Sequence, residues 1–182
     1  METLQSIKDR IPDYAKDLRL NLDAVLNRSS LTPAQASAAA LAAAFAAKSP
    51  PLVAALREGG LDAAQAQAAL TAAALMGMNN VWYPYVEMAA DPELKTVRPE
   101  LRMNAYATHG GVDRTSFELY ALAASIVGKC EFCIQSHYKL LRENGFSTQQ
   151  LRDVGRIAAV VNAVAQVLAV EHAETPEAVA IQ

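Results

Sequence analysis

The decisive stretch of this chain is Thr32-Pro33-Ala34-Gln35-Ala36-Ser37-Ala38-Ala39-Ala40-Leu41-Ala42-Ala43-Ala44-Phe45-Ala46-Ala47. Its first residues form a helix start, in which Thr32 caps, Pro33 suits the first turn and Gln35 completes a capping box. Alanine has the highest helix propensity, so the run that follows predicts a helix. Similar alanine-rich runs at 63–74 and 158–169 extend the prediction to the whole chain.

The composition agrees with an all-α protein. Of the 182 residues, 52% are hydrophobic but only 6% are aromatic, so small side chains must build the core of a close-packed helical bundle. This length is enough for one domain, which we expect to span 1–182. No segment shows strand alternation, and Gly, Pro and capping residues predict helices near 2–10, 13–27, 33–47, 52–58, 62–76, 79–89, 97–107, 115–127, 130–143 and 148–171.

Charge and hydropathy argue against two classes of partner. The net charge is -3 without a basic patch, so we expect no nucleic acid partner. The longest apolar run, Leu31 to Ala47, is interrupted by polar residues and rich in alanine, which makes it a poor membrane span. The N-terminus lacks the apolar stretch of a signal peptide, so we expect a cytoplasmic protein without membrane contact. In the cytosol, a close cysteine pair is typically catalytic or metal-binding.

The chain has two cysteines, and both lie in the motif Cys130-Glu131-Phe132-Cys133, followed by His137. On a helix, positions 130, 133 and 137 fall within an arc of roughly 60°. Two thiols at this spacing can form or exchange a disulfide, and a histidine one turn further on can move their protons. Because His137 is one turn from Cys133 and two from Cys130, it should serve Cys133. The motif predicts thiol redox chemistry.

The two thiols should differ. Gly128 and Lys129 mark a helix break, which places Cys130 in the first turn of the next helix. Free amide groups, the helix dipole and the Lys129 charge all favour an anionic sulfur there. We therefore expect a lowered pKa for Cys130, and activation of Cys133 through His137.

The spacing of Glu118 along the chain makes it a further candidate site residue. It lies 10 residues before Gly128, and His137 lies 9 after it, so two antiparallel helices would bring them to the same height. A carboxylate beside an imidazole orients the ring and raises its basicity, as in a catalytic triad. Spacing alone leaves open the alternative of a solvated residue near a helix start.

A shift of 51 residues superimposes Ala73–Gly77 on Ala124–Gly128 and Asn79 on Cys130. Both copies are an alanine-rich helix, a glycine and a second helix, so we weigh an internal helix-pair duplication against chance similarity. If the duplication is real, residues 1–110 are a scaffold half and residues 111–182 carry the redox chemistry.

The segment from Glu118-Leu119-Tyr120 through Cys130-Glu131-Phe132-Cys133 to His137 resembles the alkyl hydroperoxidase D (AhpD) family, of the carboxymuconolactone decarboxylase-like superfamily. The segments 12–17, 76–81 and 101–104 also look like that family, so the resemblance covers roughly residues 5–170. It implies an AhpD-like helical bundle, usually a homotrimer, that reduces hydroperoxides. The electrons would come from dihydrolipoyl groups on a lipoyl-bearing protein, and no cofactor would be tightly bound. The protein would also regenerate a partner peroxiredoxin, AhpC.

The resemblance also implies residue roles. Cys133 would be the peroxidatic thiol that becomes a sulfenic acid, and Cys130 the resolving thiol that condenses with it to a disulfide. His137 would be the general base, and Glu118 would orient it in a proton relay. Phe132 departs from the family, whose well-studied members carry a histidine there that is thought to assist the first cysteine.

Three alternatives stay open from the sequence. One is a non-catalytic helical interaction module, and another is a zinc site built from Cys130, Cys133, His137 and Glu118. The third is a decarboxylase-like enzyme acting on a small ring acid, which would not need paired thiols.

Overall fold

The computed structural model describes residues 3–173, which contain helices and no strand, so the all-α prediction is confirmed. Residue 2 of the predicted first helix and residues 174–182 of the predicted redox half lie outside the described residues. The α-helices are α1 (Leu4–Asp9), α2 (Lys16–Asn27), α3 (Pro33–Ala46), α4 (Pro50–Glu58), α5 (Ala63–Ala89), α6 (Asn104–Ala107), α7 (Arg114–Gly128), α8 (Glu131–Glu143) and α9 (Thr148–Ala173). Two short 3-10 helices, η1 (Asp13–Ala15) and η2 (His109–Gly111), precede α2 and α7.

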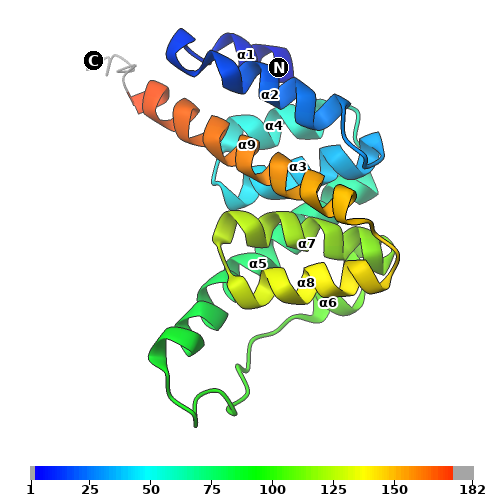
Figure 1. The fold of residues 1–182 in the computed structure, drawn as a ribbon, viewed down its shortest axis with the longest axis vertical. Helices are drawn as coiled ribbons and strands as arrows, with labels where there is room; N and C mark the ends of the chain where they lie inside the picture. Colours follow the sequence, from blue (N-terminus) through cyan, green and yellow to red (C-terminus); the bar gives the residue numbers. More distant parts are fainter. Residues whose placement is uncertain (1–2, 174–182) are drawn as a thin grey trace, which may run out of the picture.

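Helices α3, α5 and α7 pack on one another at the centre of the bundle (Figure 1). The capping box predicted for α3 is present, since the Gln35 amide donates to Thr32 Oγ1 and the Thr32 amide to Gln35 Oε1, at 3.2 and 3.0 Å. Every residue of α3 from Ala38 to Ala44 is buried. Alanine permits this because its small side chain lets helices approach closely on every side. The alanine-rich sequence therefore produces a buried central helix, with no polar face over this stretch.

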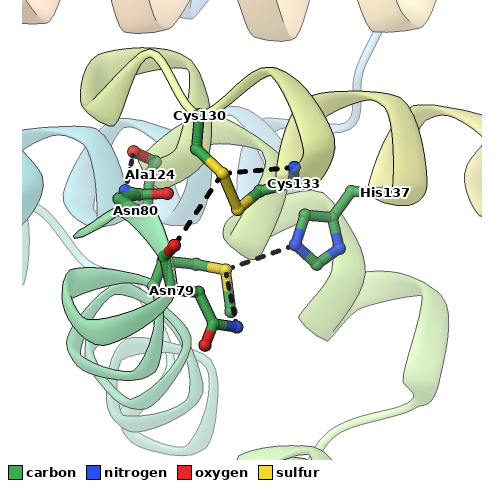
Figure 2. The surroundings of a disulfide bond; sticks show 7 residues. Asn79, Asn80, Ala124, Cys130, Cys133 and His137 are labelled. Carbon is green, nitrogen blue, oxygen red and sulfur yellow. Dashed lines mark hydrogen bonds between the residues drawn. A yellow bond between two sulfur atoms is a disulfide. The ribbon is translucent and has the colours of Figure 1, made fainter. Parts of the chain in front are cut away.

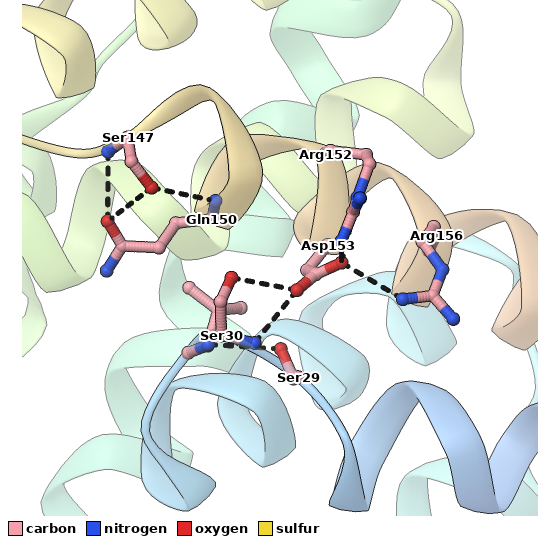
Figure 3. Close-up of polar contacts among 8 residues, drawn as sticks. Ser29, Ser30, Ser147, Gln150, Arg152, Asp153 and Arg156 are labelled. Carbon is pink, nitrogen blue, oxygen red and sulfur yellow. Dashed lines mark hydrogen bonds and ion pairs between the residues drawn. The ribbon is translucent and has the colours of Figure 1, made fainter.

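Helix α9 lies across α2, α3 and α7. The stretch Thr148–Glu171 is long and apolar enough to cross a membrane, but 44% of its apolar window is buried inside the bundle. The buried carboxylate of Asp153 holds it in place: Oδ2 accepts hydrogen bonds from the amide and hydroxyl of Ser30, both at 2.8 Å, and Oδ1 from Arg152 and Arg156 (Figure 3). This contact fixes α9 to the α2–α3 turn. The apolar side chains that α9 buries are Leu151, Val154, Ile157, Ala158, Val161, Val164, Ala165 and Leu168.

The predicted break between helices 62–76 and 79–89 is wrong, because α5 continues from Ala63 to Ala89. An internal glycine such as Gly77 costs only about 1 kcal/mol, which the packing of α5 on α3 and α7 outweighs. Asn79 and Asn80 are therefore interior residues of α5. The duplicated pattern of helix, glycine and helix is present at α7–α8 but not in α5.

The predicted helix at 97–107 is also wrong over most of its length, since only Asn104–Ala107 are α-helical. Pro99 disfavours helical backbone at Arg98, and Glu100 has a positive φ of 51°. The C-terminal part of α5 and the segment after it consequently extend away from the bundle, at the bottom of Figure 1, before the chain returns at α6.

Candidate active site

The cysteine pair lies at the corner between α7 and α8. Lys129 ends α7 in the left-handed conformation, with φ of 55°, which turns the chain so that Cys130 becomes the N-cap of α8. The Cys133 amide lies 3.3 Å from Cys130 Sγ, which accepts its hydrogen bond as a capping side chain would. The two sulfurs are joined in a disulfide (Figure 2). The sequence placed Cys130 one position too far into the helix, but its sulfur does meet the free amides of the helix start.

The two sulfurs have different surroundings. Cys130 is fully buried, and its Sγ lies 3.8 Å from the backbone oxygen of Asn79 on α5. Cys133 is 3% exposed and borders a cavity. A small molecule in this cavity therefore meets Cys133 and not Cys130.

Glu118 and His137 meet across the antiparallel pair α7 and α8. His137 Nδ1 lies 2.6 Å from Glu118 Oε2, and the side chains are 7% and 1% exposed. The alternative of a solvated Glu118 is therefore wrong. The structure thus brings all four predicted site residues, Cys130, Cys133, His137 and Glu118, to one corner of the bundle.

The second oxygen of the Glu118 carboxylate has partners that the sequence did not indicate. The Tyr106 hydroxyl donates a hydrogen bond to Oε1, and the Arg114 guanidinium lies 3.8 Å from the same oxygen. Burial is the largest single effect on the Glu118 pKa and raises it. The hydrogen bonds from His137 and Tyr106, with the charges of His137 and Arg114, together outweigh burial and lower the pKa. Glu118 is therefore a carboxylate inside the protein.

The other ring nitrogen of His137, Nε2, lies 3.2 Å from the thioether sulfur of Met76 on α5 (Figure 2). Met76 is fully buried in the core and also contacts the imidazole. A thioether is a weak acceptor, so it leaves the imidazole available to a stronger partner. Within residues 3–173, no group of three or more His, Cys, Asp or Glu side chains is placed to hold a metal ion.

The cavity at Cys133 has a volume of about 370 Å³ and a largely apolar wall. Phe132 and Tyr83 stack at one side of it, with ring centroids 4.3 Å apart. Tyr83 belongs to α5 and faces the site. The wall of the cavity consists of Asn79, Tyr83, Met103, Tyr106, Ala107, Phe132, Cys133, Ser136 and His137.

Comparison with known proteins shows the family to which the chain belongs. The chain is 45% identical to the alkyl hydroperoxide reductase AhpD of Rhodospirillum centenum, over 94% of this chain and 93% of that protein. The chain belongs to the AhpD family. The AhpD of Coxiella burnetii is 42% identical over 93% of this chain and 98% of its own length, and that of a Bradyrhizobium species is 42% identical over 90% and 91%.

The carboxymuconolactone decarboxylase family model matches residues 92–173. This region contains the α7–α8 corner with all four site residues. The resemblance inferred from the sequence is therefore confirmed, and the helical architecture is consistent with it. Residues Met76, Asn79 and Tyr83, which contact or line the site, lie before the matched region.

Proposed function

We propose that this AhpD-family protein reduces alkyl hydroperoxides through a dithiol–disulfide cycle of Cys130 and Cys133. The observation that carries the proposal is a cysteine sulfur at an apolar cavity, one helical turn from a buried histidine–carboxylate pair. A thiol, a base and a group that orients the base are the parts that an activated nucleophile requires.

The first step oxidises Cys133. In the reduced protein His137 takes the proton of the Cys133 thiol, and Glu118 stabilises the resulting imidazolium. The thiolate attacks the terminal oxygen of the hydroperoxide, so that an S–O bond forms and the O–O bond breaks. Sulfur is oxidised to the sulfenic acid, and the alkoxide leaves and takes a proton to become an alcohol.

The second step forms the disulfide. The Cys130 sulfur attacks the sulfenic sulfur of Cys133, an S–S bond forms, the S–O bond breaks, and hydroxide leaves with a proton as water. The amide of Cys133 and the start of α8 stabilise negative charge on Cys130. They favour Cys130 both as the attacking thiolate in this step and as the leaving group when the disulfide is reduced.

A dithiol of the dihydrolipoyl class closes the cycle. One of its thiolates attacks Cys133, the sulfur that borders the cavity, and its second thiol releases the donor as a cyclic disulfide. The donor thus supplies two electrons and two protons. A peroxiredoxin of the AhpC type is the protein partner that the same reduced pair would regenerate.

We further propose that the subunits assemble as a homotrimer in the cytoplasm. Val81, Tyr85 and Met88 lie on one face of the protruding end of α5 and are 69%, 51% and 79% exposed. Such an apolar face favours burial against a second copy of the chain. Sedimentation equilibrium would contradict this assembly if the protein is monomeric at micromolar concentration.

The test of the function is hydroperoxide consumption with dihydrolipoamide as the only reductant. We expect turnover by the wild type and none by Cys133→Ser. Cys130→Ser incubated with lysate should capture the electron donor as a mixed disulfide at Cys133. Turnover by Cys133→Ser would refute the nucleophile, and stoichiometric zinc in the purified protein would favour the metal-binding alternative.

A further inference from the structure

We infer that Tyr106 is a positioning residue of this site, which holds Glu118 in place through its hydroxyl and so supports His137. The inference rests on the proposed function, in which His137 removes the proton of Cys133.

The hydrogen bonds form a continuous array from α6 to α8. The Tyr106 hydroxyl donates to Glu118 Oε1, and Glu118 Oε2 lies 2.6 Å from His137 Nδ1. Each carboxylate oxygen therefore has its own partner on a different helix. A carboxylate held at both oxygens cannot rotate away from the imidazole without losing a bond to a charged group.

Packing fixes Tyr106 itself. Its ring meets Phe117 edge-to-face at 5.4 Å, with an interplanar angle of 88°. Phe117 is fully buried and precedes Glu118 on α7, so the same turn of α7 holds the ring and accepts its hydroxyl. The other side of Tyr106 borders the Cys133 cavity. The phenol thus lies between the cavity and the buried carboxylate.

Within residues 3–173, few charged or titratable groups surround the carboxylate. Those facing Glu118 are Tyr106 of α6, Arg114 of α7 and His137 of α8, and Tyr83 of α5 faces Tyr106. Arg114 is more than half exposed and 3.8 Å away, so water screens its charge. Burial, followed by the hydrogen bond to Glu118, raises the pKa of Tyr106, so the phenol stays a donor at neutral pH. Among the residues that the structure describes, removal of this hydroxyl therefore leaves Oε1 with the partly exposed Arg114 guanidinium, whose charge water screens.

The experiment measures the alkylation rate of Cys133 by iodoacetamide across the pH range in which carboxylates and imidazoles titrate. It uses reduced protein with Cys130→Ser, so that Cys133 is the single thiol. Tyr106→Phe keeps the ring and removes the hydroxyl. We expect an acid limb displaced to higher pH, because Glu118 then protonates more easily, and a rate at neutral pH lowered about tenfold. Tyr138→Phe, on α8 and away from the cavity, removes the same group and should change neither.

A double-mutant cycle shows whether Tyr106 acts through Glu118. In a Glu118→Gln background, Tyr106→Phe should change the rate by less than about twofold, because the acceptor is already altered. The inference is overturned if Tyr106→Phe leaves the pH profile unchanged, or if it slows the reaction equally in both backgrounds. Circular dichroism of each variant shows whether it is folded. If Tyr106→Phe does not fold in the parent background, the two proteins that carry Glu118→Gln, with and without Tyr106→Phe, are compared instead.

The design separates this inference from the proposed function. If the wild type consumes no hydroperoxide but the alkylation profile responds to Tyr106→Phe as expected, the peroxidase proposal fails and the role of Tyr106 stands. If Glu118→Gln itself leaves Cys133 alkylation unchanged, the relay and the inference fail together.

Discussion

Replacement of Glu118 by glutamine is the most informative perturbation of the relay, because it removes the charge and keeps the shape. The carboxylate accepts one hydrogen bond at each oxygen, from Tyr106 and from His137. Glutamine has a single oxygen, so it can keep only one of the two. A hydrogen bond to a charged group contributes about 1.5–3 kcal/mol. If that energy supports the transition state, the peroxide reaction should slow by about tenfold to about 150-fold.

The assay is single-turnover oxidation of the reduced protein by an organic hydroperoxide at neutral pH, followed as loss of thiols in a stopped-flow instrument. Glu143→Gln is the matched control, because Glu143 ends α8 on the exposed side and pairs with the exposed Lys139 at 3.9 Å. Its rate should equal that of the wild type. A Glu118→Gln protein that folds and reacts at the wild-type rate would remove Glu118 from the mechanism.

Three further predictions concern the structure around the site. Asp153→Asn should lower the free energy of unfolding by about 2 kcal/mol, because an amide cannot accept from both Ser30 and the arginines. These hydrogen bonds outweigh burial and lower the pKa of Asp153. The stability that Asp153 contributes is therefore fully present above the ordinary carboxyl pKa and is lost as the pH falls through the lowered pKa of the folded protein. Urea unfolding midpoints measured as a function of pH test this. Gly128→Ala should cost about 1–3 kcal/mol in thermal denaturation, because the new Cβ would lie 2.8 Å from Asn80 Cβ and closer still to its Cγ and Nδ2. Phe132→Ala removes a stacked ring worth about 1 kcal/mol, so KM for cumene hydroperoxide should rise about fivefold and that for hydrogen peroxide should not change.

Each of these variants has a control. Asp23→Asn disrupts an exposed pair with Lys8 and should cost less than about 0.5 kcal/mol at any pH. Gly77→Ala adds a Cβ with no heavy atom within 4 Å in mid-helix, so it should stabilise the protein by about 0.5–1 kcal/mol. Phe45→Ala, on α3 outside the cavity, should leave both KM values unchanged. The opposite order of stability for the two glycine variants would contradict the close packing of α5 on α7.

Much of this fold was predictable because local chemistry determines it. The capping box at Thr32 and the alanine run behind it specify α3 without reference to the rest of the chain. The break at Gly128 and Lys129 likewise specifies the α7–α8 corner, and equal spacing on both sides brings Glu118 to His137. These predictions depend on residues within one or two helical turns of each other, or on a simple fold-back.

The features that the sequence did not indicate depend on packing between distant segments. Gly77 does not break α5, because neighbouring helices stabilise the whole helix. Tyr106 reaches Glu118 only after a non-helical segment returns the chain to the bundle. A helical pattern predicts a core position for Met76 and nothing more. Its contact with His137 arises because α5 packs beside α8. The individual roles of Cys130, Cys133, His137 and Glu118 stay predictions until the reactions are measured.

The most direct test of the central claim adds one equivalent of organic hydroperoxide to fully reduced protein and counts the remaining thiols. We predict that the wild type loses both thiols, and that Cys130→Ser accumulates a sulfenic acid at Cys133 that dimedone traps. Cys133→Ser should keep its thiol on the same timescale. Oxidation of Cys130 in Cys133→Ser at the wild-type rate would contradict the claim that Cys133 attacks the peroxide.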